Sequence, residues 1–309
     1  MKNLKSLLTY PFEGRVHPQA VVLENQVNLW LDDCHFLPES FRQKEQKIRV
    51  GHWVASNWPD APYERLIPMA RWFLGGFLHD DHHTKLPLKE LVRVTMRIDD
   101  VWKGAAITPE DNEIVRQFGI ATDELRRFAP PEWVDRYLWH NRLFFEGIMS
   151  EAYYNFKNIY PSVEEYIDIR DKTMGGQALC DLTEVASCTI LPYEIYLHPT
   201  IQRIIKLSGY LMGWANDIYS MEKEKNDNET LNLVLVIQHT RNCTLESALK
   251  AAIQLHDDHL MEFLRLRSKL PDFHEHNEDV ERYVSSIELM IHGHLIWIRQ
   301  ASRYEVELQ

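Results

Sequence analysis

Glycine and proline are scarce in this chain, with only 12 Gly and 14 Pro among 309 residues. The sequence also contains no repeat, no low-complexity tract and no apolar–polar alternation long enough for a useful strand. Because the few helix breakers stand mostly between segments of helical periodicity, the pattern favours long helices joined by short turns. The 9 Trp, 13 Tyr and 12 Phe residues can build a substantial core. We therefore predict an all-α fold and, since nothing marks a linker, a single domain over residues 1–309.

Positive charge is also in short supply, because 34 Lys and Arg residues face 46 Asp and Glu residues and the net charge is -12. Nucleic acids and anionic membranes are held chiefly by basic surfaces. The charge balance therefore argues against either one as a general partner. A small anionic substrate would need metal ions or a local basic pocket to offset the negative field.

Cysteine pairs and long apolar runs are absent as well. The four cysteines show neither a C-x-x-C pair nor a zinc-ligand spacing, which favours reduced and mostly buried thiols. No segment approaches the apolar length of a membrane-spanning helix, and the apolar stretch after Lys5 is too short for a signal peptide. We expect a cytoplasmic protein with no stable membrane insertion.

Helix boundaries can be placed from periodicity and from capping residues. Ser162 and Glu165 form a capping box, and Thr108 and Thr244 stand where N-cap hydroxyls are expected. We also expect Pro68, like Pro59 and Pro62, to break the chain. The main helices predicted with both ends cover approximately residues 19–33, 38–57, 69–81, 199–226 and 277–300.

The stretch 216–224 carries the strongest chemical signal. In a helix Asn216, Ser220 and Glu224 are four positions apart, so that an amide oxygen, a hydroxyl and a carboxylate lie along one face. An all-oxygen set suits a hard cation such as Mg²⁺. The nearly uncharged run 207–215 leads directly into it, which indicates a face that points into a largely buried cavity. Asp217 lies about 100° round the helix and is not expected to be a ligand.

A second acidic pair, Asp80 and Asp81, stands at the C-terminal end of the apolar helix predicted over 69–81. The helix dipole disfavours negative charge there by about 0.3–1 kcal/mol, and a divalent cation would compensate. Two metal half-sites on separate helices of an all-α protein can face each other across a cavity.

Together these motifs resemble the class I terpene synthases of the bacterial type. Three further features of the family match in order: Arg170 followed by Thr173 and the pair at 175–176, the terminal Arg303 and Tyr304, and, near the start, His17-Pro18 with Trp30. The resemblance spans nearly the whole chain. It implies an α-helical bundle of the class I terpenoid synthase type with a central active-site cavity.

The resemblance also implies an activity. Members use Mg²⁺, with three ions expected here, to ionise a linear isoprenoid diphosphate, release diphosphate and cyclise the carbocation to a terpene hydrocarbon or alcohol. The enzyme would thus be a carbon–oxygen lyase. Farnesyl diphosphate is the favoured substrate and geranylgeranyl diphosphate, which would make a diterpene synthase, is the second choice. A homodimer is compatible with the resemblance.

The family assigns roles to individual positions. Catalytic roles fall to Arg170, Met174, Arg303 and Tyr304, with the backbone carbonyl of Met174 next to the reacting carbon. The expected diphosphate and substrate contacts are Arg170, Lys223, Arg303, Tyr304, Phe77 and Trp297, and the expected metal ligands are Asp80, Asp81, Asn216, Ser220 and Glu224. Thr84 and Lys85 stand where the family's first motif usually has a third acid, which leaves the role of Asp81 open.

Three other interpretations stay open. His79 and His83 are one turn apart with an acid between them, as in a helical zinc hydrolase site, although no third ligand is evident and histidines that cap a helix end would look the same. A prenyl-chain-elongating transferase would carry a second aspartate-rich motif, whereas this chain has the Asn/Ser/Glu type. An inactive helical scaffold has the missing third acid as its only support.

Overall fold

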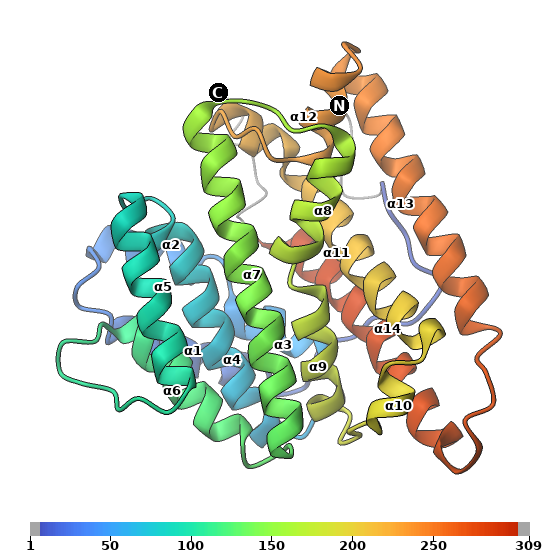
Figure 1. The fold of residues 1–309 in the computed structure, drawn as a ribbon, viewed down its shortest axis with the longest axis horizontal. Coiled ribbons are helices and arrows are strands. Elements are labelled where there is room, and N and C mark those ends of the chain that lie inside the picture. Colours follow the sequence, from blue (N-terminus) through green and yellow to red (C-terminus); the bar gives the residue numbers. More distant parts are fainter. Residues whose placement is uncertain (1–6, 302–309) are drawn as a thin grey trace.

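The computed structural model describes residues 7–301, and every regular element in this range is a helix (Figure 1). The all-α prediction is therefore confirmed. None of the helices in the described range is both long and apolar enough to cross a membrane. That residues 1–309 form one domain stays a prediction.

The first half of the chain supplies eight helical elements in the described range. They are α1 (Ala20–Asp32), α2 (Glu39–Gln46), α3 (Val50–Asn57), α4 (Tyr63–Leu78), the π-helix η2 (His79–His83), α5 (Leu88–Trp102), α6 (Glu113–Leu125) and α7 (Pro131–Lys157).

The second half follows the same pattern of helices and short connections. Its elements are α8 (Val163–Thr173), α9 (Gly176–Ala186), α10 (Tyr193–Tyr196), α11 (Pro199–Asn226), α12 (Leu233–Thr240), α13 (Leu245–Arg267), the 3₁₀-helix η3 (His274–His276) and α14 (Asn277–Gln300).

Helices far apart in sequence pack against one another to form the bundle. α3 packs on α14, α4 on α6, and α11 on α13 and α9, while α7 stands upright in the middle of Figure 1 with α5 and α6 to its left. The core is aromatic: Trp102, Trp133 and Trp214 are fully buried. The indole Nε1 of Trp53 in α3 donates to Nδ1 of His294 in α14 at 3.0 Å, which ties the N-terminal and C-terminal helices together.

Several predicted boundaries are confirmed. Ser162 and Glu165 form the capping box of α8, with both reciprocal hydrogen bonds present. Thr244 caps α13 through a bond from the amide of Ser247. Helices α11 and α14 cover the predicted ranges 199–226 and 277–300.

Other boundary predictions are wrong. The helix expected over 38–57 is two helices, because Arg49 adopts a left-handed conformation with φ of 61° between α2 and α3. Pro68 lies inside α4 rather than breaking the chain. Thr108 does not cap a helix: α6 begins at Glu113, and its N-cap is Asn112. Helix α12 was not predicted at all.

Two glycines, Gly175 and Gly176, lie at the break between α8 and α9, and each meets a different structural requirement. Gly175 has φ of +65°, a left-handed conformation that suits glycine, and a Cβ there would have room, with its nearest neighbour 3.8 Å away. Gly176 instead allows close packing, because a Cβ at this position would lie 2.6 Å from the Cα of Gly209 in α11. The second glycine therefore sets the distance between α9 and α11.

The left-handed backbone of Gly175 and the close packing of Gly176 predict different effects of substitution. Gly176→Ala should lower the free energy of unfolding by about 1–3 kcal/mol, because its methyl group overlaps a backbone that cannot move aside. Gly175→Asn should have a smaller effect, since asparagine tolerates the left-handed region. Urea denaturation measures both. Gly76→Ala in α4 is the matched control, because nothing lies within 4 Å of its Cβ position; a Gly176→Ala protein as stable as this control would contradict the packing argument.

Candidate active site

One cavity of about 1710 Å³ collects the predicted site residues that the structure describes. Its wall includes side chains from α4, η2, α7, α8, α11 and α14. The predicted residues among them are Phe77, Asp80, Asp81, Arg170, Met174, Asn216, Ser220, Lys223, Glu224 and Trp297. Arg303 and Tyr304 lie outside the described residues. The structure thus brings the motifs together, while the role of each residue stays a prediction.

The oxygen set of α11 faces this cavity as the spacing predicts. Ser220 is buried and Asn216 and Glu224 are half-buried along one face of the helix. In the described part of the chain no three His, Cys, Asp or Glu side chains form a cluster able to hold a metal ion. A cation on this wall would therefore need the amide oxygen of Asn216 and the hydroxyl of Ser220 beside the carboxylate, which is a donor set that fits Mg²⁺.

A second part of the cavity wall carries Asp80 and Asp81 on η2. Here the chain changes from α-helical to π-helical hydrogen bonding, and the amide of Thr84 donates to the carbonyl of His79, five residues back, at 3.3 Å. The hydroxyl of Thr84 also donates to the carbonyl of Asp80. Both aspartates are half-buried and line the cavity. The wider turn therefore lets two consecutive carboxylates line the cavity wall.

Two buried histidines of η2, His79 and His83, bond to each other and connect η2 to the start of α6. Nδ1 of His79 and Nδ1 of His83 lie 2.8 Å apart, and Nε2 of His83 lies 3.3 Å from the side-chain amide of Asn112, the N-cap of α6. Burial lowers the pKa of His79 to about 3 and that of His83 to about 4, so both rings are neutral near pH 7. The two rings bond to each other, and no third ligand joins them among residues 7–301. This geometry gives the zinc hydrolase interpretation no support.

Arg170 reaches the cavity from α8 and is held by α11. Its Nη2 lies 2.8 Å from Oδ1 of Asn216 and 2.7 Å from Oδ1 of Asp217. Asp217 is 1% exposed, and its Oδ2 accepts bonds from the hydroxyl of Tyr166 at 2.5 Å and the amide of Leu233 at 3.0 Å. Asp217 thus fixes the arginine, and both of its carboxylate oxygens have protein partners.

Sequence reasoning missed these partners of the motif. The adjacency of Asp217 to Asn216 was visible, but its pairing with Arg170 depends on how α8 packs on α11. Asn232, the N-cap of α12, bonds Glu224 through its side-chain amide at 2.7 Å, and no pattern in the sequence pointed to it. Nζ of Lys223, a predicted diphosphate contact, forms an ion pair with Oδ2 of Asp227 at 3.2 Å, one turn further along the chain.

Aromatic rings form the wall beyond the acidic groups. The ring centroids of Trp53, Phe77 and Trp297 lie 5.9–6.3 Å apart in an edge-to-face or tilted cluster. The indole Nε1 of Trp297 donates to the carbonyl of Ile48 at 2.7 Å, and the residue is only 3% exposed. Burial and this hydrogen bond together fix the ring.

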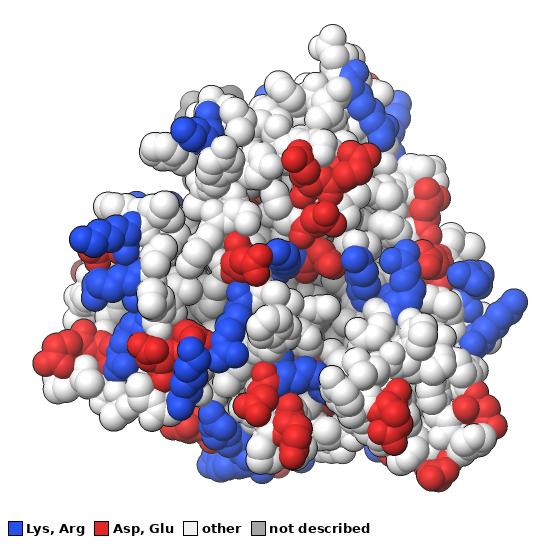
Figure 2. Space-filling model, viewed as in Figure 1, with Lys and Arg blue, Asp and Glu red and all other residues white. Residues whose placement is uncertain are grey.

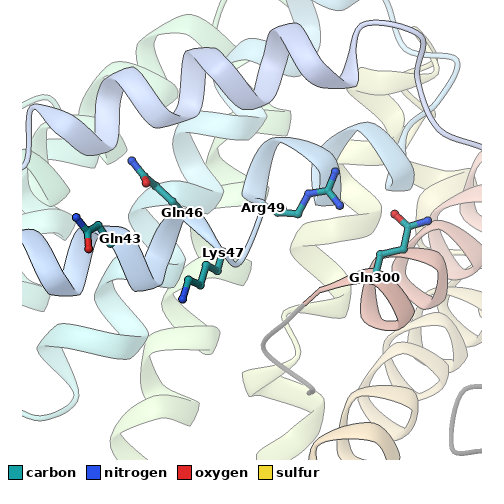
Figure 3. A pocket seen from close by; sticks show the side chains of 5 residues that line it. All are labelled: Gln43, Gln46, Lys47, Arg49 and Gln300. Carbon is teal, nitrogen blue, oxygen red and sulfur yellow. The ribbon is translucent and has the colours of Figure 1, made fainter. Parts of the chain in front are cut away.

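A second, smaller pocket of about 580 Å³ lies beside the cavity (Figure 3). Its lining residues are Gln43, Gln46, Lys47, Arg49 and Gln300, and Lys47 also lines the large cavity. Figure 2 shows acidic side chains gathered near the middle of the displayed face with Lys and Arg residues close by, and no extended basic surface on that face.

Comparisons with known proteins agree with one another. Residues 71–262 match the family described as "Terpene synthase family 2, C-terminal metal binding". The chain is 29% identical to (+)-T-muurolol synthase ((2E,6E)-farnesyl diphosphate cyclizing) of Roseiflexus castenholzii, over 98% of this chain and 94% of the relative. It is also 29% identical to 10-epi-cubebol synthase of Sorangium cellulosum, over 96% and 97% of the two chains.

Solved structures of similar shape include 2-methylisoborneol synthase from Streptomyces coelicolor, crystallised with Mg²⁺ and 2-fluoroneryl diphosphate. It superposes with a TM-score of 0.85 at 21% identity over 99% of both chains. An a-eudesmol synthase superposes with a TM-score of 0.85 at 19% identity, over 94% of this chain and 98% of the other. At these identities the likeness establishes the fold.

Acid should destabilise the cavity wall through His294. Burial, with the charge of Arg170, lowers the pKa of this histidine to about 3, and its Nδ1 accepts from Trp53 and must stay unprotonated. The unfolded chain, with a histidine pKa near 6.5, binds the proton first, so stability falls as the pH drops below about 6.5. The loss should approach roughly 1.4 kcal/mol per pH unit for this group.

Urea unfolding at pH 7.0 and 5.5 measures this effect. His294→Gln should reduce the pH dependence, whereas His35→Gln, at an exposed position, should leave it unchanged. An equal pH dependence in wild type and His294→Gln would show that His294 does not carry it.

Proposed function

Since the chain belongs to the terpene synthase family, whose members are lyases acting on prenyl diphosphates, we propose that it ionises farnesyl diphosphate and cyclises the resulting carbocation to a terpene hydrocarbon or alcohol. The observation that carries this proposal is the large cavity, which is lined by two groups of oxygen donors, a fixed arginine and an aromatic cluster. The relative from Roseiflexus castenholzii, a synthase that cyclises (2E,6E)-farnesyl diphosphate, supports farnesyl diphosphate as the substrate. A cytoplasmic location and a homodimer stay predictions.

The metal ligands we propose are Asp80 and Asp81 on one wall and Asn216, Ser220 and Glu224 on the other. All five offer oxygen donors to the same cavity, and the family is described as metal binding. Bound Mg²⁺, for which we propose three ions, would act as a Lewis acid that neutralises the charge of the leaving diphosphate.

Arg170 and Lys223 supply the positive charge that the chain itself brings to the diphosphate. Arg170 can offer its planar fork of N–H donors to phosphate oxygens, and the buried carboxylate of Asp217 keeps that fork in place. We propose the same function for Arg303 and Tyr304 from the terminal segment. Met174, the C-cap of α8, lines the cavity next to Gly175, so that its carbonyl is a candidate for contact with the reacting carbon.

The aromatic cluster protects the carbocation after ionisation. Phe77 and Trp297 line the cavity with Trp53, and a cation over an aromatic face gains about 0.5–2 kcal/mol. Apolar walls also exclude water, which would otherwise quench the cation early. The same cavity thus separates a charged end, where the diphosphate leaves, from an apolar end, where the hydrocarbon folds.

Incubation of the purified protein with Mg²⁺ and diphosphates of ten, fifteen and twenty carbons tests this function. We expect a cyclic hydrocarbon or alcohol from farnesyl diphosphate, identified by mass spectrometry, and no product when EDTA removes the metal. Product from the twenty-carbon substrate alone would make the enzyme a diterpene synthase. A longer diphosphate formed with isopentenyl diphosphate would indicate chain elongation, and no product from any substrate would indicate a scaffold.

Substitution of the two aspartates of η2 tests the first metal wall. Asp80→Asn should lower kcat/KM on the order of 10²-fold or more, because one anionic oxygen ligand is lost. Asp81→Asn should raise the Mg²⁺ concentration needed for half-maximal rate. Asp123→Asn, whose side chain is 81% exposed on α6, is the matched control. An unchanged Mg²⁺ dependence in Asp81→Asn would remove Asp81 from the metal site.

A further inference from the structure

Asn232 lies just outside the motif and joins α12 to the oxygen face of α11. The residue is fully buried at the N-cap of α12, where its Oδ1 accepts from the amides of Val234 at 2.8 Å and Leu235 at 3.4 Å. Its Nδ2 donates to Oε2 of Glu224 at 2.7 Å and to the carbonyl of Asp217 at 2.8 Å. One side chain therefore caps one helix and bonds the other.

The amide group is held at both ends. Because α12 fixes Oδ1, the plane of the amide and the direction of both Nδ2 hydrogens are fixed as well. These hydrogens point to α11, where the hydroxyl of Ser220 also lies 3.5 Å from Nδ2. The bond to Oε2 thereby restrains the side chain of Glu224 before any ligand arrives, which reduces the ordering entropy that would otherwise oppose binding.

The type of side chain matters for the charge of this wall. A lysine or arginine at position 232 would neutralise the charge of Glu224 and compete with a bound cation. A carboxylate at this position would repel the carboxylate of Glu224. The amide of Asn232 donates a hydrogen bond and leaves the negative charge of Glu224 in place. The bond occupies one of the two carboxylate oxygens.

A second bond makes the contact between α12 and α11 stiff. The amide of Leu233 donates to Oδ2 of Asp217 at 3.0 Å, and the other oxygen of Asp217 pairs with Arg170. Helix α12 also packs on α8 and α13. The start of α12 is therefore connected to Glu224 and, through Asp217, to the proposed diphosphate contact Arg170.

From this arrangement we propose that Asn232 is a positioning residue for the metal site: it holds the carboxylate of Glu224, and with it the hydroxyl of Ser220, in the orientation that receives Mg²⁺. The inference rests on the proposed function, because it concerns the same metal site.

Two substitutions separate positioning from helix capping. Asn232→Ser and Asn232→Asp both retain an oxygen that can cap α12, and both lose the donor to Glu224. Asn232→Asp in addition places a negative charge against Glu224. Calorimetric titration with Mg²⁺ in the presence of inorganic diphosphate should show an affinity at least tenfold weaker for Asn232→Ser and weaker still for Asn232→Asp.

The Mg²⁺ concentration for half-maximal rate should rise in parallel, while the melting temperature of metal-free Asn232→Ser stays close to that of wild type. Thr244→Ser, which alters the exposed N-cap of α13, is the control and should change none of these values. In a Glu224→Gln background, Asn232→Ser should have little further effect on the Mg²⁺ affinity, because the carboxylate that Asn232 positions is already absent.

The outcomes distinguish the two proposals. If the wild type binds no Mg²⁺, the proposed function fails and the inference fails with it. If the wild type binds Mg²⁺ and Asn232→Ser binds it equally well, the inference alone is overturned. If both variants fail to fold although they keep the capping oxygen, the role of Asn232 is structural and the inference is likewise overturned.

Discussion

The buried ion pair between Arg170 and Asp217 is the interaction on which the rest of the site depends. It joins α8 to α11, and the second oxygen of Asp217 binds the hydroxyl of Tyr166 and the amide that begins α12. Removing one partner of such a pair typically costs about 3–5 kcal/mol, because the other charge remains buried without compensation. Three helices and the proposed diphosphate contact thus share a single carboxylate.

A surplus of negative charge surrounds this pair. Desolvation raises the pKa of Asp217 to about 6 and those of Glu151 and Glu229, which also line the cavity, to about 7. Burial disfavours the ionised form of each group, and repulsion from neighbouring carboxylates raises the pKa values further, although Arg170 or Lys223 lies near enough to lower each one. Negative charge of this kind favours cations, which agrees with the metal site proposed above.

Much of the site was predictable because its chemistry repeats within single helices. The spacing of Asn216, Ser220 and Glu224 depends only on the helical pitch, and the capping box at Ser162 is local too. The π-helix and the contacts of α12 with α11 were not predictable, because both depend on bonds between helices: the bond that the side-chain amide of Asn112 donates to His83 and the bonds that Asn232 donates to α11. Local sequence patterns carry no record of such partners.

The π-helix at 79–83 holds one more residue per turn than the α-helix that precedes it. Relative to a continuous α-helix it therefore behaves as a single-residue insertion. The wider turn changes the direction in which the side chains of this segment point around the helix axis. Removing the extra residue would restore α-helical winding with little rotation of the segment that follows, whereas winding the same five residues as an α-helix would turn that segment by about 100°. The winding of residues 79–83 is therefore a constraint in its own right, distinct from the identity of the acids, because it decides which side chains of this segment line the cavity.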